Sequence, residues 1–354
     1  MERYMDGNNQ NSLPQFNVHY TWIYLTERCN LQCEYCFYRH RSGGRGISQE
    51  AVERLFCLFD RHQTYPLTLI FSGGEAFLVK NRMFQIMSEA RRRLQKTSLH
   101  VQTNGLLIDK SDIKTLLDLH VSLEFGIDGL FEQTQRHRWG LKATSFSRLI
   151  DNIQRCLQSG VSCGCTMTVH PSEVEYMEDG LRFLQSIGLH QVDITPAAFE
   201  PWTPPKVEDF KRAYLSIIRQ KDLRRLLYTQ EDIKKVRFGW LDLSLHPPGY
   251  LLGGDPFLCL PEEKRKEFSL WNEKTGLLKK DMYNYYKEGL RDIWREEERL
   301  SYREQVCRNF ELVNRMMGKA YINTWAINDM LRYQCRVHQK LWSYMSVSEN
   351  TGHA

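Results

Sequence analysis

Residues 19–36, HYTWIYLTERCNLQCEYC, join a strand-like run to a cysteine-rich loop. Positions 19–26 are rich in aromatic and β-branched side chains, which favour an extended strand. Cys29, Cys33 and Cys36 then fall within eight residues, with the spacing CxxxCxxC. Cysteines at such intervals can wrap several thiolates around one metal cluster. We therefore expect the first strand of a sheet, with a metal-binding loop at its carboxyl end.

Three chemistries suit these thiols. A [4Fe–4S] cluster has four irons, so three thiolates would hold it and leave one iron open for another ligand. A structural zinc site would need a fourth ligand, which His40 could supply. Buried thiols without a metal are the third alternative, but charged residues stand beside these cysteines, and that is not the pattern of a core.

Outward from this loop, residues 18–195 alternate β-rich runs with helical patterns. Repeated strand–helix units predict a parallel sheet with helical crossovers, and six units predict an open, TIM-like partial (β/α)6 barrel of the α/β class. Ser48 is expected to cap the first helix, and Ser172 with Glu175 to form a capping box at the last. The expected strands are 19–26, 67–72, 99–103, 121–127, 162–169 and 191–195. The expected helices are 48–62, 81–95, 109–118, 145–159 and 173–187.

The strand–helix pattern stops after Pro196, and the proline-rich stretch 201–205 marks a boundary. Beyond it the sequence predicts two basic helices to about residue 237, a hairpin within 241–260 and a mixed hairpin and helical extension that ends in two helices within 302–346. The expected divisions are a flexible segment 1–17, a barrel core 18–200, a C-terminal extension 201–346 and a frayed tail 347–354.

The composition indicates the setting and the partners. Of 354 residues, 42% are hydrophobic, which excludes a wholly disordered chain. No apolar run reaches the roughly 18 residues of a membrane span, and no signal-peptide core is visible, so we expect a cytoplasmic protein without a membrane partner. Residues 205–240 hold ten Lys and Arg against five Asp and Glu, and so local an excess argues against nucleic acid. The excess of positive charge indicates either a solvated helix face or a surface that attracts an acidic leader peptide.

Ten cysteines in a reducing compartment are not expected to form a disulfide framework. Cys57 stands next to the apolar stripe of the first expected helix and Cys156 lies on the stripe of a later one, which favours a place in the core for both. Cys163 and Cys165 alternate with small polar residues along one strand, so they share its apolar face and are also expected to pack. The small polar set that alternates with them, Ser162, Gly164, Thr166 and Thr168, would face the barrel interior.

Further candidates follow the second strand. Gly73 and Gly74 would let a ligand approach the backbone, and Glu75 could accept hydrogen bonds from an ammonium group. The alternative is an ordinary turn with a solvated glutamate. Because active sites of barrel sheets lie at the carboxyl ends of the strands, the position of this turn favours a site.

Taken together, these motifs resemble the radical S-adenosylmethionine (SAM) family. The resemblance implies that Cys29, Cys33 and Cys36 bind a [4Fe–4S] cluster after the first strand of a partial barrel. It implies that Tyr35, the aromatic residue before the third cysteine, lies near the SAM adenine. The GGE motif of the family, here Gly73, Gly74 and Glu75, holds the SAM amino group; Ala76 stands where proline is usual.

Later strand ends carry the resemblance further. Thr103-Asn104-Gly105 matches a frequent feature at the end of the third strand. Residues 122–129, SLEFGIDG, are similar to the S-x-D-G strand end near the SAM ribose, with Gly126 in place of the serine. The resemblance leaves Glu124 and Asp128 as candidate ribose contacts. Arg138 is similar in position to an arginine in the segment after that strand.

The resemblance also implies an activity. Reduction of the cluster, by a donor such as flavodoxin or ferredoxin, would cleave SAM to methionine and a 5′-deoxyadenosyl radical that abstracts hydrogen from a substrate. Residues 244–259 are similar to the hairpin of SPASM or twitch extensions in radical SAM peptide maturases, which favours a peptide or protein side chain as substrate. Dehydrogenation or rearrangement of a small molecule is the alternative. A non-enzymatic iron–sulfur or zinc protein, a different class, would not need the glycine–glutamate turn.

SPASM extensions carry auxiliary clusters and are richer in cysteine than this chain, which offers Cys259, Cys307 and Cys335 there. Cys335 and His338 are spaced to share one helix face. A second cluster or a zinc site is therefore one alternative, and thiols in the core or at the surface are the favoured one. We expect a single cluster, with about four irons per chain.

Overall fold

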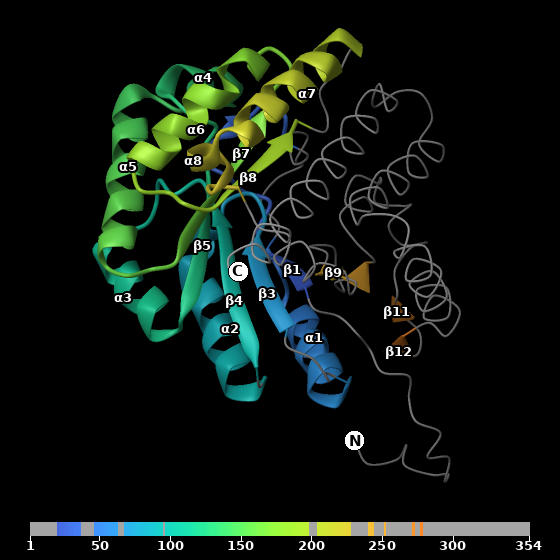
Figure 1. The fold of residues 1–354 in the computed structure, drawn as a ribbon. Coiled ribbons are helices and arrows are strands. Elements are labelled where there is room, and N and C mark those ends of the chain that lie inside the picture. The colour runs from blue at the N-terminus through green and yellow to red at the C-terminus, as the bar shows by residue number, and fades with distance from the viewer. Residues whose placement is uncertain are drawn as a thin grey trace, which may run out of the picture.

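The computed structural model describes residues 20–36, 46–62, 67–94, 96–197 and 204–227, together with four short strands between 240 and 278. Six neighbouring parallel strands follow chain order in one sheet, from β1 to the edge strand β8, which confirms the α/β prediction (Figure 1). They are β1 Tyr20–Tyr24, β3 Leu67–Ser72, β4 Thr97–Thr103, β5 Val121–Gly126, β7 Cys163–Val169 and β8 Val192–Pro196. Because the strands are parallel and in register, their carboxyl ends meet along one edge, with Tyr24 opposite Ser72 and Gly126 opposite Thr166.

The expected hairpin within 241–260 is present as β9 Trp240–Leu243 and β10 Leu251–Leu252, which pair antiparallel. β9 also pairs in parallel with β1, so the central sheet has eight strands. A separate antiparallel pair joins β11 Trp271–Asn272 and β12 Leu277–Leu278. Sequence patterns did not predict the pairing of β9 with β1.

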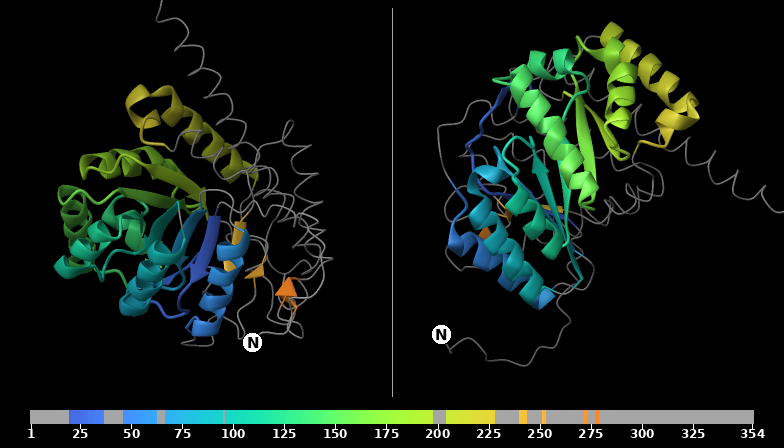
Figure 2. Two further views of the ribbon diagram at one scale, coloured as in Figure 1. Left: turned by 90° about the horizontal axis from the view of Figure 1, so that it is seen from below. Right: turned by 90° about the vertical axis from the view of Figure 1, so that its left-hand side faces the viewer.

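Helices cover one side of the sheet in both further views (Figure 2). They are α1 Gln49–His62, α2 Lys80–Arg93, α3 Lys110–Asp118, α4 Phe131–His137, α5 Ala143–Gln158, α6 Met177–Ser186, α7 Pro204–Arg219 and α8 Lys221–Arg224, with 3-10 turns η1 Ala76–Val79 and η2 Val174–Tyr176. Ser48 caps α1 as expected, since its hydroxyl accepts a hydrogen bond from the Ala51 amide at 3.1 Å. None of the described helices is long and apolar enough to cross a membrane.

The capping box predicted at Ser172 and Glu175 is wrong. α6 begins only at Met177, after η2, and no side chain caps either of them. The Ser172 hydroxyl instead hydrogen-bonds with His170 at 2.8 Å and with Glu173 at 3.1 Å. Neighbours within two positions in the chain therefore take the hydroxyl that the sequence pattern assigned to the helix end.

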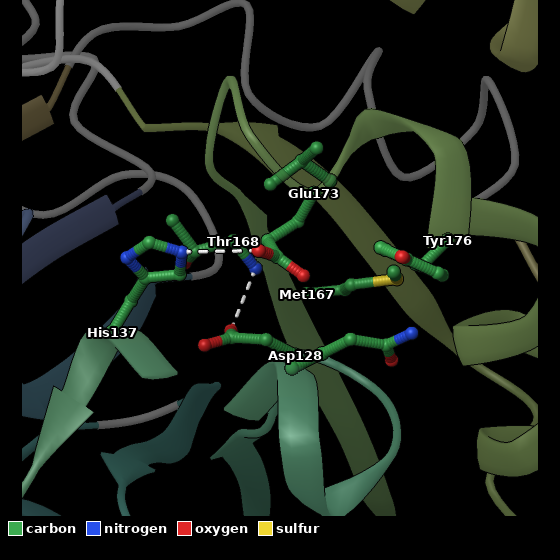
Figure 3. Close-up of a pocket in the computed structure, with 8 residues that line it drawn as sticks. Asp128, His137, Met167, Thr168, Glu173 and Tyr176 are labelled. Carbon is green, nitrogen blue, oxygen red and sulfur yellow. Dashed lines mark hydrogen bonds and ion pairs between the residues drawn. The ribbon is translucent and has the colours of Figure 1, made fainter. Parts of the chain in front are cut away.

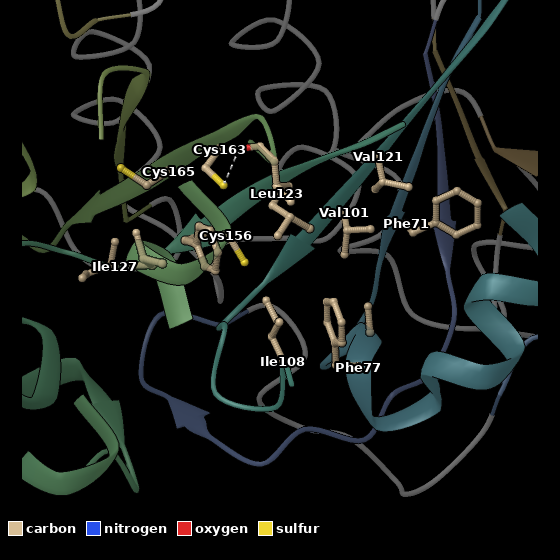
Figure 4. Close-up of a cluster of buried hydrophobic side chains, with 14 of the residues drawn as sticks. Phe71, Phe77, Val101, Ile108, Val121, Leu123, Ile127, Cys156, Cys163 and Cys165 are labelled. Carbon is tan, nitrogen blue, oxygen red and sulfur yellow. Dashed lines mark hydrogen bonds between the residues drawn. The ribbon is translucent and has the colours of Figure 1, made fainter. Parts of the chain in front are cut away.

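The core lies between the sheet and its helices (Figure 4). Alternate residues of neighbouring strands point into it, because successive side chains of a strand face opposite sides. Cys156, Cys163 and Cys165 are buried there, which confirms their packing role. The labelled strand residues Phe71, Val101, Val121 and Leu123 and, from the adjoining turns, Phe77, Ile108 and Ile127 are also buried.

Cys57 is not a core residue, contrary to expectation. It is only partly buried, and its thiol lies 3.4 Å from a carboxylate oxygen of Glu53, one turn earlier on α1. The guanidinium of Arg93 on α2 ion-pairs with Glu53 at 2.8 Å and approaches the same thiol. The apolar stripe of α1 therefore ends beside an ionic contact between two helices.

Several predictions fall outside the described residues. They are the segment 1–17, His40, the helices within 302–346, the tail 347–354, and Cys259, Cys307, Cys335 and His338. Among the seven described cysteines, no disulfide is formed.

Candidate functional site

The cysteine loop leaves the carboxyl end of β1 and is shaped by two local turns. The Leu31 amide donates to the Cys29 sulfur at 3.4 Å, and the Cys36 amide donates to the Cys33 carbonyl at 3.2 Å. Between these turns lies β2 Gln32–Cys33, which pairs antiparallel with β6 Arg138–Trp139. Neither short strand was predicted. Their pairing places Cys33 directly opposite Arg138.

The electrostatics of the three thiols suit a cationic cluster. Burial raises the pKa of Cys33 to about 11; the guanidinium of Arg138 opposes this rise, while Cys36, Asp128 and Cys29 add to it. Cys33 thus senses both other cysteines of the motif, and without a cation its neutral thiol form is favoured because a thiolate there would be repelled by any charge on the other two. Metal binding relieves such repulsion, because thiolates are the ligand form and the metal neutralises them. The donor set therefore fits a [4Fe–4S] cluster.

The Gly73-Gly74-Glu75 turn after β3 packs directly on the segment that leads into the cysteine loop. The Gly74 amide donates to the Thr26 carbonyl at 2.6 Å, and the Glu75 amide donates to the Arg28 carbonyl at 2.8 Å. A Cβ at Gly74 would lie 2.1 Å from the Arg28 carbonyl oxygen, and Gly73 has a φ of +131°. Both glycines are therefore required by the close approach of protein backbone, where sequence reasoning had considered only a ligand.

Glu75 is not a solvated glutamate. Its side chain is buried and accepts hydrogen bonds from the Phe77 amide at 3.0 Å, the Thr103 hydroxyl at 2.7 Å and the Asn104 amide at 2.8 Å. Burial raises the pKa of Glu75, and these donors offset part of the rise. The carboxylate therefore ties the end of β3 to the end of β4.

Asn104 extends this connection to the cysteine loop. Its side-chain amide donates to the Asn30 side-chain oxygen at 2.7 Å and lies 3.9 Å from the Cys29 sulfur. Sequence reasoning noted Asn104 only as part of a motif and gave it no role. The loop is thus held from β3 through Glu75 and from β4 through Asn104.

Tyr35, Asp128 and Arg138 meet in one triad, in which Asp128 and Arg138 are buried and Tyr35 is partly buried. Asp128 accepts two hydrogen bonds from Arg138, at 2.8 and 2.7 Å, and one from the Tyr35 hydroxyl at 2.5 Å. A fourth comes from the Thr168 amide at 3.0 Å. The Arg138 guanidinium carbon lies 5.5 Å from the centre of the Tyr35 ring. Three residues that the sequence singled out separately are therefore one unit, which also joins the cysteine loop to β7.

Glu124 belongs to a different network. His100 lies 3.1 Å from its carboxylate, Gln102 donates to it at 3.4 Å, and the Thr166 hydroxyl also donates to it. Burial acts to raise the pKa of Glu124, but these hydrogen bonds and the His100 charge lower it overall. Among the described residues no hydrogen bond joins Glu124 to the triad. Glu124 bonds to Thr166, whose side chain was expected to face the barrel interior from β7.

A pocket beside the triad contains residues that sequence reasoning missed (Figure 3). Asp128 and Thr168 line it, and His137 and Glu173 point toward each other across it, 3.4 Å apart. The other ring nitrogen of His137 lies 2.8 Å from a carboxylate oxygen of Glu34, within the cysteine loop. No local pattern indicates the contact between His137 and Glu34, because the two residues are 103 positions apart in the chain.

His137, Glu34 and His170 each place a potential ligand atom within 4.8 Å of the others. The two imidazole rings, however, are stacked at 3.8 Å with an angle of 18°. Nearly parallel rings direct their nitrogen lone pairs side by side and not toward one point, so this arrangement suits packing better than metal ligation. Burial also lowers the pKa of His170 to about 4, which keeps that ring neutral at neutral pH.

Comparisons with known proteins agree with this geometry. Residues 23–184 match the Radical SAM superfamily. The chain is 24% identical over 179 residues to the serine-type anaerobic sulfatase-maturating enzyme of Bacteroides thetaiotaomicron, covering 48% of this chain and 43% of the relative. It is 25% identical over 181 residues to the PqqA peptide cyclase of Granulibacter bethesdensis, covering 50% of this chain and 47% of that relative. The chain therefore spans about half the length, or less, of these two curated relatives.

Solved structures share the fold. The structure described as native anSMEcpe with bound AdoMet and Cp18Cys peptide aligns with a TM-score of 0.65, at 16% identity, over 94% of this chain and 99% of that one. At this identity the likeness concerns the fold alone.

Proposed function

We propose that the chain is a radical SAM enzyme acting on a side chain of a peptide or protein, a proposal that starts from the match of residues 23–184 to the Radical SAM superfamily. One observation carries the proposal: the cysteine loop stands at the carboxyl edge of the sheet, fastened there by the glycine–glutamate turn, by Asn104 and by the Tyr35–Asp128–Arg138 triad. Barrel active sites lie at this edge.

Cys29, Cys33 and Cys36 would hold a [4Fe–4S] cluster with one iron open to SAM. When bound and reduced, the cluster with SAM supplies a 5′-deoxyadenosyl radical that abstracts hydrogen from the substrate. The contribution of the chain is to position these groups and to limit competing reactions. The contacts around Cys29 and Cys33, from Asn104 and β6, support a loop that is held in place before the cofactor binds.

Gly73, Gly74 and Glu75 are the candidates for binding the SAM amino group. A carboxylate offers about four hydrogen-bond acceptor sites, and Glu75 uses three of them on Phe77, Thr103 and Asn104. The remaining site is available to an ammonium group. We assign Glu75 this role together with its structural role between β3 and β4.

The number of hydrogen bonds that each carboxylate already accepts also separates the roles of Asp128 and Glu124. Asp128 already accepts four hydrogen bonds, from Arg138, Tyr35 and the Thr168 amide, so we assign it to positioning Tyr35 and Arg138 beside SAM. Glu124 accepts three and keeps a site for a ribose hydroxyl.

The names of the relatives support the substrate class. Two act, by name, on sulfatases and on the PqqA peptide, and the similar solved structure holds a peptide. A low-potential donor such as flavodoxin or ferredoxin would supply the electron. The dehydrogenation or rearrangement of a small molecule is the competing reading of the same chemistry.

The test begins with anaerobic reconstitution of the full chain, addition of dithionite and SAM, and measurement of 5′-deoxyadenosine. Wild type should form it, and Cys33→Ala should lose both the cluster absorbance and the product. Cys57→Ala is the matched control, because that thiol lies on α1 among Glu53 and Arg93. Activity retained by Cys33→Ala would refute the assignment.

The substrate is tested separately. The reconstituted enzyme is incubated with the peptide encoded beside its gene, and the peptide mass is measured. A loss of hydrogen mass or a cross-link supports a peptide substrate. SAM cleavage that leaves every such peptide unchanged favours the small-molecule reading.

A further inference from the structure

Arg138 is the cross-strand neighbour of the middle cysteine. In the β2–β6 ribbon Cys33 lies opposite Arg138. Directly opposite residues of an antiparallel pair have side chains on the same face, with Cβ atoms about 5 Å apart. The Arg138 side chain is 9% exposed, so its charge is little screened by solvent. A nearly buried cation therefore stands beside the thiolate that the cluster would use.

The charge of Arg138 is partly balanced by Asp128. The two form a bidentate ion pair whose side chains are 9% and 6% exposed. Arg138 is nevertheless the residue directly opposite Cys33, and Asp128 binds only Nε and one terminal nitrogen of its guanidinium, so the other terminal nitrogen makes no hydrogen bond to Asp128. The cationic member of the pair is therefore the one that lies opposite Cys33, while its anionic member contacts the same loop at Tyr35.

Gly126 makes room for this arrangement. A Cβ there would lie 2.8 Å from one terminal nitrogen of the guanidinium, and that nitrogen is not the one that binds Asp128. Since the related strand-end motif carries serine at this position, the guanidinium stands where that side chain would begin. The absence of a side chain at Gly126 and the position of Arg138 are therefore complementary.

We propose that Arg138 is a positioning residue that raises the reduction potential of the cluster bound by Cys33, and that Asp128 opposes it. The inference rests on the proposed function, because it needs a cluster on Cys29, Cys33 and Cys36. Reduction adds one electron, from dithionite in the test, to a cluster that already carries the negative charge of its thiolates. A nearby cation stabilises the reduced form more than the oxidised form, and a nearby anion does the reverse.

The experiment measures the potential of the reconstituted full chain by a dithionite titration followed by electron paramagnetic resonance, without SAM. Arg138→Gln should lower the equilibrium constant for reduction of the cluster at least tenfold, which corresponds to a fall in reduction potential of about 59 mV for one electron. Asp128→Asn should raise it. The double variant should return toward wild type, because both charges are gone, and Arg138→Lys, which keeps the charge, should stay within threefold.

The opposite signs separate an electrostatic role from a structural one. Loosening of the loop would move both single variants the same way, and that result would overturn the proposal, as would shifts below threefold in both. If Arg138→Gln retains no iron, the reduction potential of Asp128→Asn alone decides the proposal, because that variant keeps the guanidinium of Arg138. Failure of wild type to bind a cluster or cleave SAM would instead refute the proposed function.

Discussion

Gly74→Ala tests whether the glycine–glutamate turn supports the cysteine loop. The added Cβ would lie 2.1 Å from the Arg28 carbonyl oxygen, 0.9 Å short of the 3.0 Å below which such contacts essentially never occur. The neighbour is backbone, so the two segments must separate. Separation breaks the hydrogen bonds from Gly74 to Thr26 and from Glu75 to Arg28. Losing two such bonds and leaving their donors unsatisfied costs about 2–5 kcal/mol.

The assay is urea unfolding of the apo protein under reducing, anaerobic conditions, followed by iron content after reconstitution. Gly46→Ala is the control, since a Cβ there meets the Leu25 carbonyl oxygen at an ordinary 3.5 Å. We expect the control to be neutral or slightly stabilising, by up to about 1 kcal/mol. A Gly74→Ala variant that unfolds within about 0.5 kcal/mol of this control and binds the full complement of iron would show that the backbone contact does not position the loop.

Three further predictions concern the cluster, a helix cap and Gly126. Wild type should bind about four irons per chain, and Cys33→Ala should bind fewer; about eight irons in wild type would show a second cluster. Asp109 caps α3, and hydrogen bonds from Lys80 and others hold its pKa far below the ordinary 3.8. Asp109→Ala should lower the free energy of unfolding by about 1 kcal/mol at pH 7. Because the pKa of Asp109 is lower in the folded than in the unfolded protein, its stabilising effect is present above the unfolded pKa and is lost as the pH falls. The cost of the substitution should therefore shrink below about pH 4, and a constant cost down to pH 2 would contradict this. Gly126→Ser should cost about 1–3 kcal/mol in unfolding free energy, but much less in an Arg138→Ala background, where the clashing guanidinium is gone; equal costs in both backgrounds would exclude the contact.

The strands and most helices could be predicted because their signals are local. Alternation of apolar and polar residues decides which face of a strand is buried, and burial does alternate along β4 and β5. The missed elements, among them α4, β2, β6, β11 and β12, are short. Strands of two residues have no periodicity of their own, so they exist only through the partner that they pair with.

The candidate site was partly predictable for the same reason. The spacing of Cys29, Cys33 and Cys36 is written within eight residues, and each strand-end motif lies at one position in the chain. What these groups do to one another is not. Glu75, expected to accept hydrogen bonds from an ammonium group, is buried and already bonded to Thr103 and Asn104. Cys57, expected in the core, lies beside Arg93.

By itself the sequence determined a parallel α/β sheet with a thiolate loop at its carboxyl edge, since both follow from patterns that span less than a helix or a loop. Only the tertiary structure decided that Tyr35 bonds to Asp128, 93 positions later, and that Arg138 stands opposite Cys33. Such pairs form when strands settle side by side, and their energy depends on burial and mutual distance. Burial and the distance between side chains are not defined for an extended chain, so the charges around the cysteine loop follow only from the folded structure.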